Sequence, residues 1–173
     1  MIELRKIDGD NIEEIIALEV EENQNKFLET TNLRSFADAH DMNSEEIPAI
    51  PLAIYVDEFL VGFIMYVYDT LDNEAFEDRD FYGKKSYFIW QFMIGKDYQG
   101  KGYGKEAFTE ALKCIETMPC GEAEYIVLFY NIENVKAKTL YSSFDFIETG
   151  IIIDNSILAI KKIDSNNFKI VNQ

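Results

Sequence analysis

Three glycines alternate with other residues in the segment Gly100-Lys-Gly-Tyr-Gly104, and this spacing is the strongest chemical signal in the chain. Glycine has no Cβ atom, so its backbone reaches conformations that are closed to other residues, and successive N–H groups can point toward one anion. Lys101 and Lys105 add positive charge beside these groups. The pattern predicts phosphate binding by the backbone, which is strongest where such a loop opens a helix.

The sequence on either side indicates a turn between a strand and a helix. The preceding residues 87–94 form a bulky apolar run of strand length. After the loop, apolar residues recur at helical spacing, at Ala107, Phe108, Ala111, Leu112 and Ile115. Two other phosphate-binding loops are excluded, because a P-loop needs Gly-x-x-x-x-Gly-Lys-Ser/Thr and a dinucleotide loop needs Gly-x-Gly-x-x-Gly.

A second motif follows in the segment Asn134-Val-Lys-Ala-Lys-Thr-Leu-Tyr-Ser-Ser-Phe-Asp-Phe146. Together with Gln99, Gly102 and Gly104, it resembles the two signature segments of the GNAT superfamily of acyl-CoA-dependent N-acetyltransferases, Gln/Arg-x-x-Gly-x-Gly/Ala and Asn-x-x-Ala-x-x-Leu-Tyr-x-x-x-Gly-Phe. The one departure is Asp145, where glycine is usual. Because Asp tolerates a left-handed backbone better than most residues do, we expect the helix to end there nonetheless.

The resemblance implies a site for acetyl-CoA as cosubstrate. No metal site is expected, because the sequence has no cluster of Cys or His residues. In this superfamily the glycine loop holds the CoA pyrophosphate, and the preceding strand ends in a splayed bulge whose backbone binds the pantetheine arm. That backbone is also expected to supply donors for the thioester oxygen. Lys138 is an alternative to Lys136 near the nucleotide phosphates. The cosubstrate residues implied here are Phe92, Met93, Ile94, Gln99, Gly100, Lys101, Gly102, Tyr103, Gly104, Lys105, Asn134, Lys136 and Ala137.

The resemblance also implies that Tyr141 is the general acid. A phenol with a pKa near about 10 is protonated at neutral pH, so it can give a proton to a departing thiolate without first being ionised. Without the family motif, Tyr141 would be assigned to packing on one face of a helix.

The general base is not evident from the sequence. An alkyl ammonium must lose a proton before it attacks a thioester, which requires a carboxylate or a chain of water molecules. Polyamine acetyltransferases of this superfamily commonly place Glu or Asp just before the splayed strand end, where this chain has Trp90 and Gln91. Glu22, Glu29 and Asp69 are the alternatives, both as base and as partners of a cationic substrate, beside a water relay.

The composition bears on the partner. The formal net charge is −16, from 32 acidic and 16 basic residues. This charge argues against a nucleic-acid partner and would attract a small cationic amine, although solubility alone also explains an acidic surface. The resemblance is greatest to the bacterial spermine/spermidine acetyltransferases, which implies a polyamine acceptor. The alternatives are an aminoglycoside-like drug, an amino acid or a protein N-terminus, and a non-catalytic acyl-CoA-binding regulatory domain.

The periodicity of the whole chain indicates the elements that must position these residues. We expect a GNAT-like α/β fold of the α+β type, with the order βααβββαβαββ and a mixed, mostly antiparallel sheet of about seven strands flanked by about four helices. One domain is expected over residues 1–163 and a polar tail over residues 164–173. A helix is expected to open at Ser35, and the acidic stretch 69–80 is expected to be a loop or ragged strand end that adds nothing to the core.

The remaining expectations concern location and association. No apolar run approaches the roughly 20 residues of a membrane helix, and no signal segment is evident, so a cytoplasmic protein without a membrane partner is expected. Cys114 and Cys120 are the only cysteines and are expected to be reduced, since no cluster completes a zinc site. Dimers are frequent among members of the superfamily, so a homodimer is a further expectation.

Overall fold

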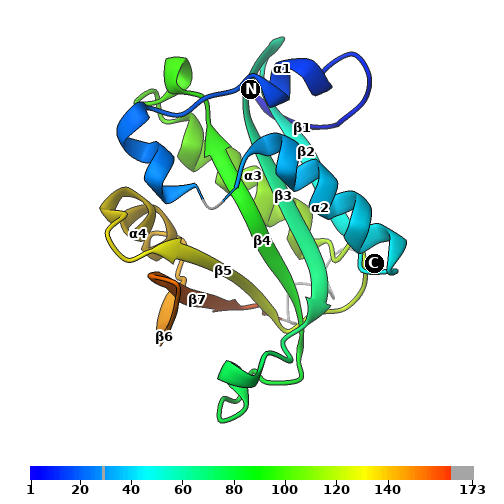
Figure 1. Ribbon diagram of the computed structural model, residues 1–173, viewed down its shortest axis with the longest axis vertical. Coiled ribbons are helices and arrows are strands. Elements are labelled where there is room, and N and C mark those ends of the chain that lie inside the picture. Colours follow the sequence, from blue (N-terminus) through cyan, green and yellow to red (C-terminus); the bar gives the residue numbers. More distant parts are fainter. Residues whose placement is uncertain (29, 165–173) are drawn as a thin grey trace. The chain divides into compact units, whose positions relative to one another are not determined.

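The computed structural model of the protein describes residues 1–28 and 30–164. Within these residues, seven strands form one open mixed sheet in the order β1-β2-β3-β4-β5-β7-β6. Figure 1 shows the strands and the four α-helices that accompany them. Strands and α-helices follow one another as βααβββαβαββ, so the predicted fold class and element order are confirmed. Apart from Asp164, the predicted polar tail lies outside the described residues.

The chain divides into two compact units. The first comprises Met1–Val67 and Ile89–Pro119, and the second comprises Tyr68–Phe88 and the chain from Cys120 onward. The glycine loop therefore belongs to the first unit and the Asn134–Phe146 segment to the second. The expectation of one domain over residues 1–163 stays a prediction.

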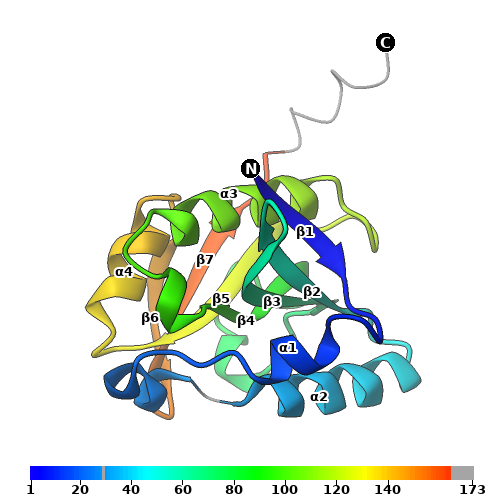
Figure 2. The same cartoon turned by 90° about the horizontal axis from the view of Figure 1, so that it is seen from above.

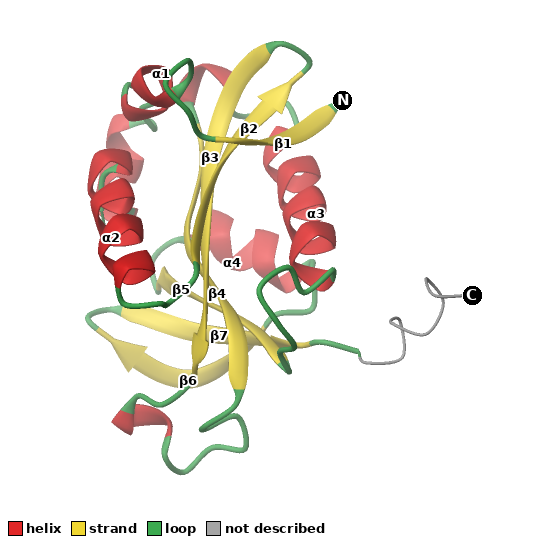
Figure 3. Ribbon diagram, turned by 90° about the vertical axis from the view of Figure 1, so that its right-hand side faces the viewer, coloured by secondary structure: helices red, strands yellow, loops and turns green. Residues whose placement is uncertain are grey.

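In the first unit, two helix layers enclose a sheet. The strands are β1 (Ile2–Lys6), β2 (Ala49–Val56), β3 (Phe59–Thr70, as far as Val67) and β4 (Lys85–Ile94, from Ile89). The α-helices are α1 (Ile12–Ile16), α2 (Asn32–Ser44) and α3 (Tyr103–Glu116). β1 pairs with β2 and β2 with β3, both antiparallel. Figures 2 and 3 show α1 and α2 on one face of these strands and α3 on the other.

The helices of this unit form where their apolar faces are covered, and α3 shows this most simply. Its buried residues are the five that the helical spacing predicted, Ala107, Phe108, Ala111, Leu112 and Ile115. The start predicted for α2 at Ser35 is wrong, because Thr31 caps the helix by accepting a hydrogen bond of 3.1 Å from the Arg34 N–H. Ser35 instead lies in the first turn and is fully buried. None of the helices in the described part of the chain has the length and apolar character that crossing a bilayer requires.

The second unit is built on three antiparallel strands. These are β5 (Tyr125–Asn131), β7 (Ser156–Lys162) and β6 (Ile147–Ile153), in which β7 pairs with both neighbours. The helix α4 (Val135–Ser142) connects β5 to β6. Asp154 and Asn155 both have positive φ, 48° and 63°, which is the backbone of a tight hairpin turn between β6 and β7.

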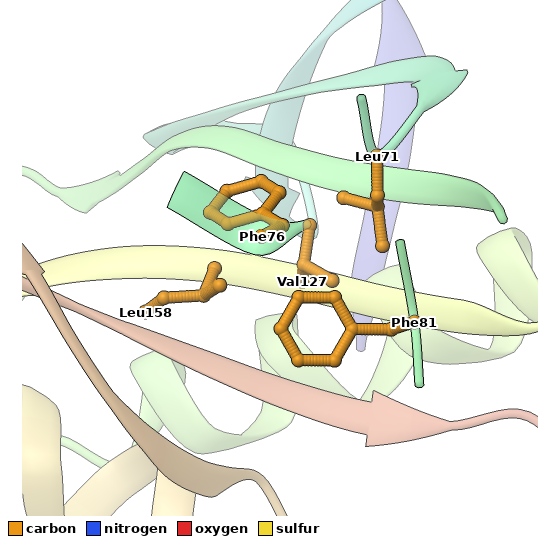
Figure 4. Close-up of a cluster of buried hydrophobic side chains, with 5 residues drawn as sticks. All are labelled: Leu71, Phe76, Phe81, Val127 and Leu158. Atoms are coloured by element: carbon orange, nitrogen blue, oxygen red, sulfur yellow. The ribbon is translucent and has the colours of Figure 1, made fainter. Parts of the chain in front are cut away.

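The acidic stretch after β3 forms a loop as predicted, but the expectation that it adds nothing to the core is wrong. Figure 4 shows Phe76 and Phe81 packed with Leu71 and with Val127 of β5 and Leu158 of β7. The rings of Phe76 and Phe81 lie 5.6 Å apart, and each residue is only 5% exposed. Leu71, Phe76 and Phe81 face inward around a short 3-10 helix, η2 (Glu74–Phe76), while the acids of the loop are exposed to the solvent.

Candidate active site

The glycine loop leads from β4 to α3 through a short 3-10 helix, η3 (Lys96–Tyr98). Gly100 and Gly102 have φ values of 75° and 86°, a left-handed backbone that side chains with a Cβ rarely adopt. Gly102 is the N-cap of α3 and offers no side chain to its first turn. The prediction of a glycine-specific backbone is therefore confirmed for Gly100 and Gly102. It is wrong for Gly104, which is the second residue of α3 and has no left-handed φ.

This loop retains hydrogen-bond donors that could hold an anion. The N–H groups of Lys105 and Glu106 donate back to the Gly102 carbonyl, at 3.1 and 3.3 Å. Among the described residues, the N–H groups from Gly100 to Gly104 find no acceptor in the protein. The first N–H groups of a helix have no partner within it, and the helix dipole there favours negative charge. Tyr103 and Lys105 are the first and third residues of α3, and Lys105 adds positive charge beside the free N–H groups. The loop therefore has the donors and the charge that fit a diphosphate.

The side chain of Gln99 is used to hold the loop together. Its Nε2 donates to the carbonyl of Ile94 at the end of β4, at 2.9 Å. Its amide also exchanges two hydrogen bonds with the amide of Gln24, with donor–acceptor distances of 2.8 and 3.0 Å. Lys101, another predicted cosubstrate residue, donates from Nζ to the Asp97 carbonyl at 2.9 Å. Nothing in the sequence signalled a role for Gln24.

At the end of β4, the side chains of Met93 and Ile94 belong to the core and that of Phe92 is half-buried. Met93 and Ile94 are 4% and 8% exposed, and the ring of Phe92 packs edge-on against Phe108 of α3 at 5.2 Å. The backbone here is closely approached by β3, since a Cβ atom at Gly62 would lie 2.5 Å from the Met93 carbonyl oxygen. That the backbone N–H groups of Phe92, Met93 and Ile94 face a thioester oxygen stays a prediction.

A buried network of neutral side chains surrounds Gln91, one of the two positions at which the resemblance implied a carboxylate. Gln91 of β4 accepts a short hydrogen bond from the Ser35 hydroxyl and donates to Asn32 Oδ1 at 2.7 Å. Asn32 in turn donates to the Ile15 carbonyl at 2.7 Å and to the sulfur of Met93 at 3.3 Å. All three polar residues are less than 9% exposed. Gln91 thus ties α2 to β4 and cannot act as a base.

The first turn of α4 presents the second set of predicted cosubstrate residues. Asn134 caps the helix by accepting a hydrogen bond of 3.0 Å from the Ala137 N–H, which occupies its carbonyl oxygen. Lys138 forms an ion pair with Glu148 at 3.1 Å. Lys136 is exposed and forms no ion pair within the described residues, and its proximity to a phosphate stays a prediction.

Tyr141 lies near the end of α4, between two aromatic rings. Its ring is tilted against those of Tyr130 and Phe146, with centroids 5.6 and 6.1 Å away. Burial raises the pKa of Tyr141 above its ordinary value, so the phenol stays protonated. The predicted helix end is confirmed, because Asp145 has φ 65° and the Phe146 N–H donates back to the Tyr141 carbonyl at 3.2 Å.

Tyr130, whose ring packs against Tyr141, and Glu148, which is hydrogen-bonded to Tyr130, were not identified from the sequence. The Tyr130 hydroxyl donates a short hydrogen bond to Glu148 Oε1, while Lys138 contacts the same carboxylate. Burial and this bond raise the pKa of Tyr130, and the bonds from Tyr130 and Lys138 lower the pKa of Glu148. The pairing of a strand tyrosine with an acid in β6 is a long-range contact with no local sequence signal.

The three candidate carboxylates differ in their settings. Glu22 is exposed in the first unit and lines an open pocket of about 390 Å³ together with Glu19, Val20, Glu21, Asn25 and Lys96. Asp69 belongs to the second unit, where it is half-buried and accepts a hydrogen bond from the Thr70 N–H at 2.7 Å. Glu29 lies outside the described residues.

Comparison with known proteins gives one family and several relatives. The acetyltransferase (GNAT) family matches residues 12–146. A probable spermine N(1)-acetyltransferase of Bacillus subtilis subsp. natto is 31% identical over 147 residues, which are 84% of this chain and 87% of that protein. The spermine/spermidine N(1)-acetyltransferase of Bacillus subtilis strain 168 is 30% identical over the same shares of both chains.

Solved structures share the fold at low sequence identity. A spermidine N-acetyltransferase from Vibrio cholerae in complex with CoA and spermine superposes with a TM-score of 0.65 at 16% identity, covering 94% of this chain and 95% of that one. Arabidopsis thaliana NAA60 in complex with a bisubstrate analogue gives a TM-score of 0.65 at 15% identity, covering 95% of this chain and 99% of that one.

Proposed function

The chain belongs to the GNAT acetyltransferase family and is an acetyl-CoA-dependent N-acetyltransferase, and we propose that its acceptor is a primary amine of a polyamine such as spermine or spermidine. The observation that carries the choice of acceptor is the identity shared with two Bacillus proteins named as spermine acetyltransferases. This identity extends well beyond the cosubstrate motifs, over 84% of the chain.

The charge of the protein supports this acceptor. A polyamine carries several ammonium groups, each of which is stabilised by a carboxylate. The chain has a formal net charge of −16, and three glutamates, Glu19, Glu21 and Glu22, line one open pocket of the first unit. A negative surface raises the local concentration of a polycation and speeds its encounter with the protein.

Acetyl-CoA supplies the acetyl group, and we assign its diphosphate to the loop between β4 and α3. The unpaired N–H groups from Gly100 to Gly104 would donate to the phosphate oxygens, and Lys105 would add charge. In the second unit, Asn134 and Ala137 would contact the pantetheine arm, with Lys136 reaching the nucleotide phosphates.

Tyr141 would hold the proton that the departing thiolate needs. Its raised pKa keeps the phenol neutral across the physiological range, so its hydroxyl is always a donor. Burial also raises the pKa of a thiol that lies beside the phenol. The difference in pKa between the Tyr141 phenol and the CoA thiol is therefore smaller than the raised pKa of Tyr141 alone suggests. The amine must lose its proton elsewhere, to Glu22, to Asp69 or to water, since Gln91 cannot accept one.

The acceptor is tested with a panel of amines. Purified protein is mixed with acetyl-CoA and with spermine, spermidine, an aminoglycoside, free amino acids or a peptide N-terminus, and the release of CoA thiol is followed. We expect kcat/KM to be highest for spermine or spermidine. Release no faster than background with both polyamines, or a higher kcat/KM for another amine, would show that the proposed acceptor is wrong.

The role of Tyr141 is tested by Tyr141→Phe, which removes the hydroxyl and keeps the ring between Tyr130 and Phe146. General acid catalysis typically contributes about 10²- to 10⁴-fold, so kcat should fall by that order while CoA affinity changes little. Tyr82→Phe is the matched control, because Tyr82 is 39% exposed and its hydroxyl makes no hydrogen bond among the described residues. An unchanged kcat in Tyr141→Phe would remove the acid role.

A further inference from the structure

In the first unit, residues 18–24 lie along the start of the cosubstrate loop, residues 95–99, and polar bonds join them at both ends. At one end, the Lys96 N–H donates to the Glu19 carbonyl at 2.7 Å, and Lys96 Nζ pairs with Glu19 Oε2 at 2.7 Å. At the other end, the amides of Gln24 and Gln99 exchange two hydrogen bonds. Leu18 fills the space beside Gly95, where a Cβ would lie 3.0 Å from Leu18 Cδ2.

The Gln24–Gln99 pair determines how Gln99 is oriented. One N–H of Gln99 holds the Ile94 carbonyl at 2.9 Å, and the rest of the amide is engaged by Gln24. Without Gln24, the Gln99 carbonyl and its second N–H would have only solvent as partner, and the amide could rotate away from Ile94. The end of β4 and the turn that leads to Gly100 are thus fixed by a side chain from another part of the chain.

Within residues 19–24, Val20 is the one buried side chain, at 7% exposure, and the others are exposed or half-buried. Gln24 belongs to a 3-10 helix, η1 (Glu22–Phe27), that has no buried residue. An open pocket of about 390 Å³ lies between the two polar connections, lined by residues 19–22, Asn25 and Lys96. Because Val20 is the only buried side chain of the segment, the polar bonds to the loop are a large share of what orders residues 21–24, and the same bonds hold the loop.

We propose that Gln24 is a positioning residue that couples the hold of the loop on CoA to the ordering of residues 19–24, the segment that carries Glu22. When CoA orders the loop, the loop also orders residues 19–24 through the Gln24–Gln99 pair. A second ligand that binds this segment then loses less free energy to ordering it, so the two ligands bind cooperatively. The coupling is reciprocal, since an amine that orders the segment must tighten CoA by the same factor. The inference rests on the proposed function for the identity of the two ligands.

The first test measures CoA binding by calorimetry to the full-length protein and to Gln24→Ala. Loss of two neutral hydrogen bonds should weaken CoA binding about 5- to 20-fold. Asn23→Ala is the matched control, because Asn23 is an exposed neighbour on η1 whose side chain makes no hydrogen bond among the described residues, and the variant should bind CoA within about twofold of the unchanged protein. The double variant Gln24→Ala/Gln99→Ala should bind no more weakly than Gln99→Ala, because both changes remove the same pair.

The second test separates positioning from a structural defect. In Gln24→Ala the KM for acetyl-CoA should rise about 5- to 20-fold with kcat within about twofold, and thermal unfolding should stay within about 3 °C of the unchanged protein. Saturating spermidine should tighten CoA about fivefold in the unchanged protein and not in the variant. If Gln24→Ala binds CoA normally, or if the losses of CoA affinity add in Gln24→Ala/Gln99→Ala, the coupling is refuted and the proposed function is unaffected. If the unchanged protein does not bind CoA, both the proposed cosubstrate and the coupling fail.

Discussion

Replacing Gly102 and Gly104 by alanine separates the two reasons for which a phosphate loop uses glycine. At Gly102, φ is 86° and the nearest atom to an added Cβ is Glu106 Oε1 at 3.9 Å, so the change introduces strain without a clash. A left-handed backbone costs an L-residue roughly 1–2 kcal/mol, which lowers the melting temperature by about 2–8 °C in a chain of this length. Gly104 is helical and its Cβ would lie 3.8 Å from Ile94 Cγ1, so alanine should leave stability unchanged or raise it by up to about 1 kcal/mol.

CoA affinity should respond differently from stability. If the backbone around Gly104 approaches the diphosphate, the methyl group of Gly104→Ala displaces it, and we expect CoA to bind about tenfold more weakly, or about 1.4 kcal/mol, in a protein that unfolds no earlier. Gly83→Ala is the control for strain alone, since Gly83 has φ 74° and no atom within 4 Å. It should melt earlier and bind CoA normally. Normal CoA binding by Gly104→Ala would refute the backbone site, and an unchanged melting temperature for Gly102→Ala would refute the strain argument.

Three further predictions concern stability, each measured by thermal or denaturant unfolding. Gly62→Ala should destabilise the fold by about 1–3 kcal/mol, because the new Cβ would lie 2.5 Å from the Met93 carbonyl oxygen; equal stability would mean that β3 and β4 do not approach so closely. Asp145→Gly should stabilise it by about 0.5 kcal/mol, since φ is 65° there, and a loss would show that the Asp side chain matters more than backbone strain. The hydrogen bond from Tyr130 lowers the pKa of Glu148 below its ordinary value of 4.5. The carboxylate therefore stabilises the fold above pH 4.5, and this stabilisation is lost as the pH falls through the lowered pKa. Glu148→Gln should therefore lose up to about 1 kcal/mol at pH 7, less at high salt, and match the unchanged protein once acid has protonated the carboxylate; a pH-independent difference would contradict the ionic origin.

The fold could be predicted wherever local pattern and global packing agree. The five residues buried in α3 recur at helical spacing in the sequence, and the stop at Asp145 follows from a backbone preference of a single residue. Gly100 and Gly102 were predicted for the same reason, because a left-handed φ is a local property. These features need no knowledge of what lies elsewhere in the chain.

Prediction failed where the role of a residue differs from the role that its type or its sequence neighbours suggest. Phe76 stands among acids and is nevertheless core, because a short turn points it at Val127, which lies far along the chain. Serine is a common N-cap residue, yet Ser35 is buried and donates a hydrogen bond to Gln91, and Thr31 caps the helix instead. A prediction from composition treats such residues like their sequence neighbours. Only their contacts with residues far away in the sequence show that they are buried.

The residues missed at the site have one property in common, which is that each acts through another side chain. Gln24 holds Gln99, Asn32 holds Gln91, and Glu148 holds Tyr130, which packs against Tyr141. A motif identifies the groups that would touch the ligand because the ligand imposes their spacing. It does not identify their supports, because an amide can be held from any direction that the fold provides. For the same reason, substitutions at these supports should change the affinity, rate or pH dependence of the site without removing any group that contacts a substrate.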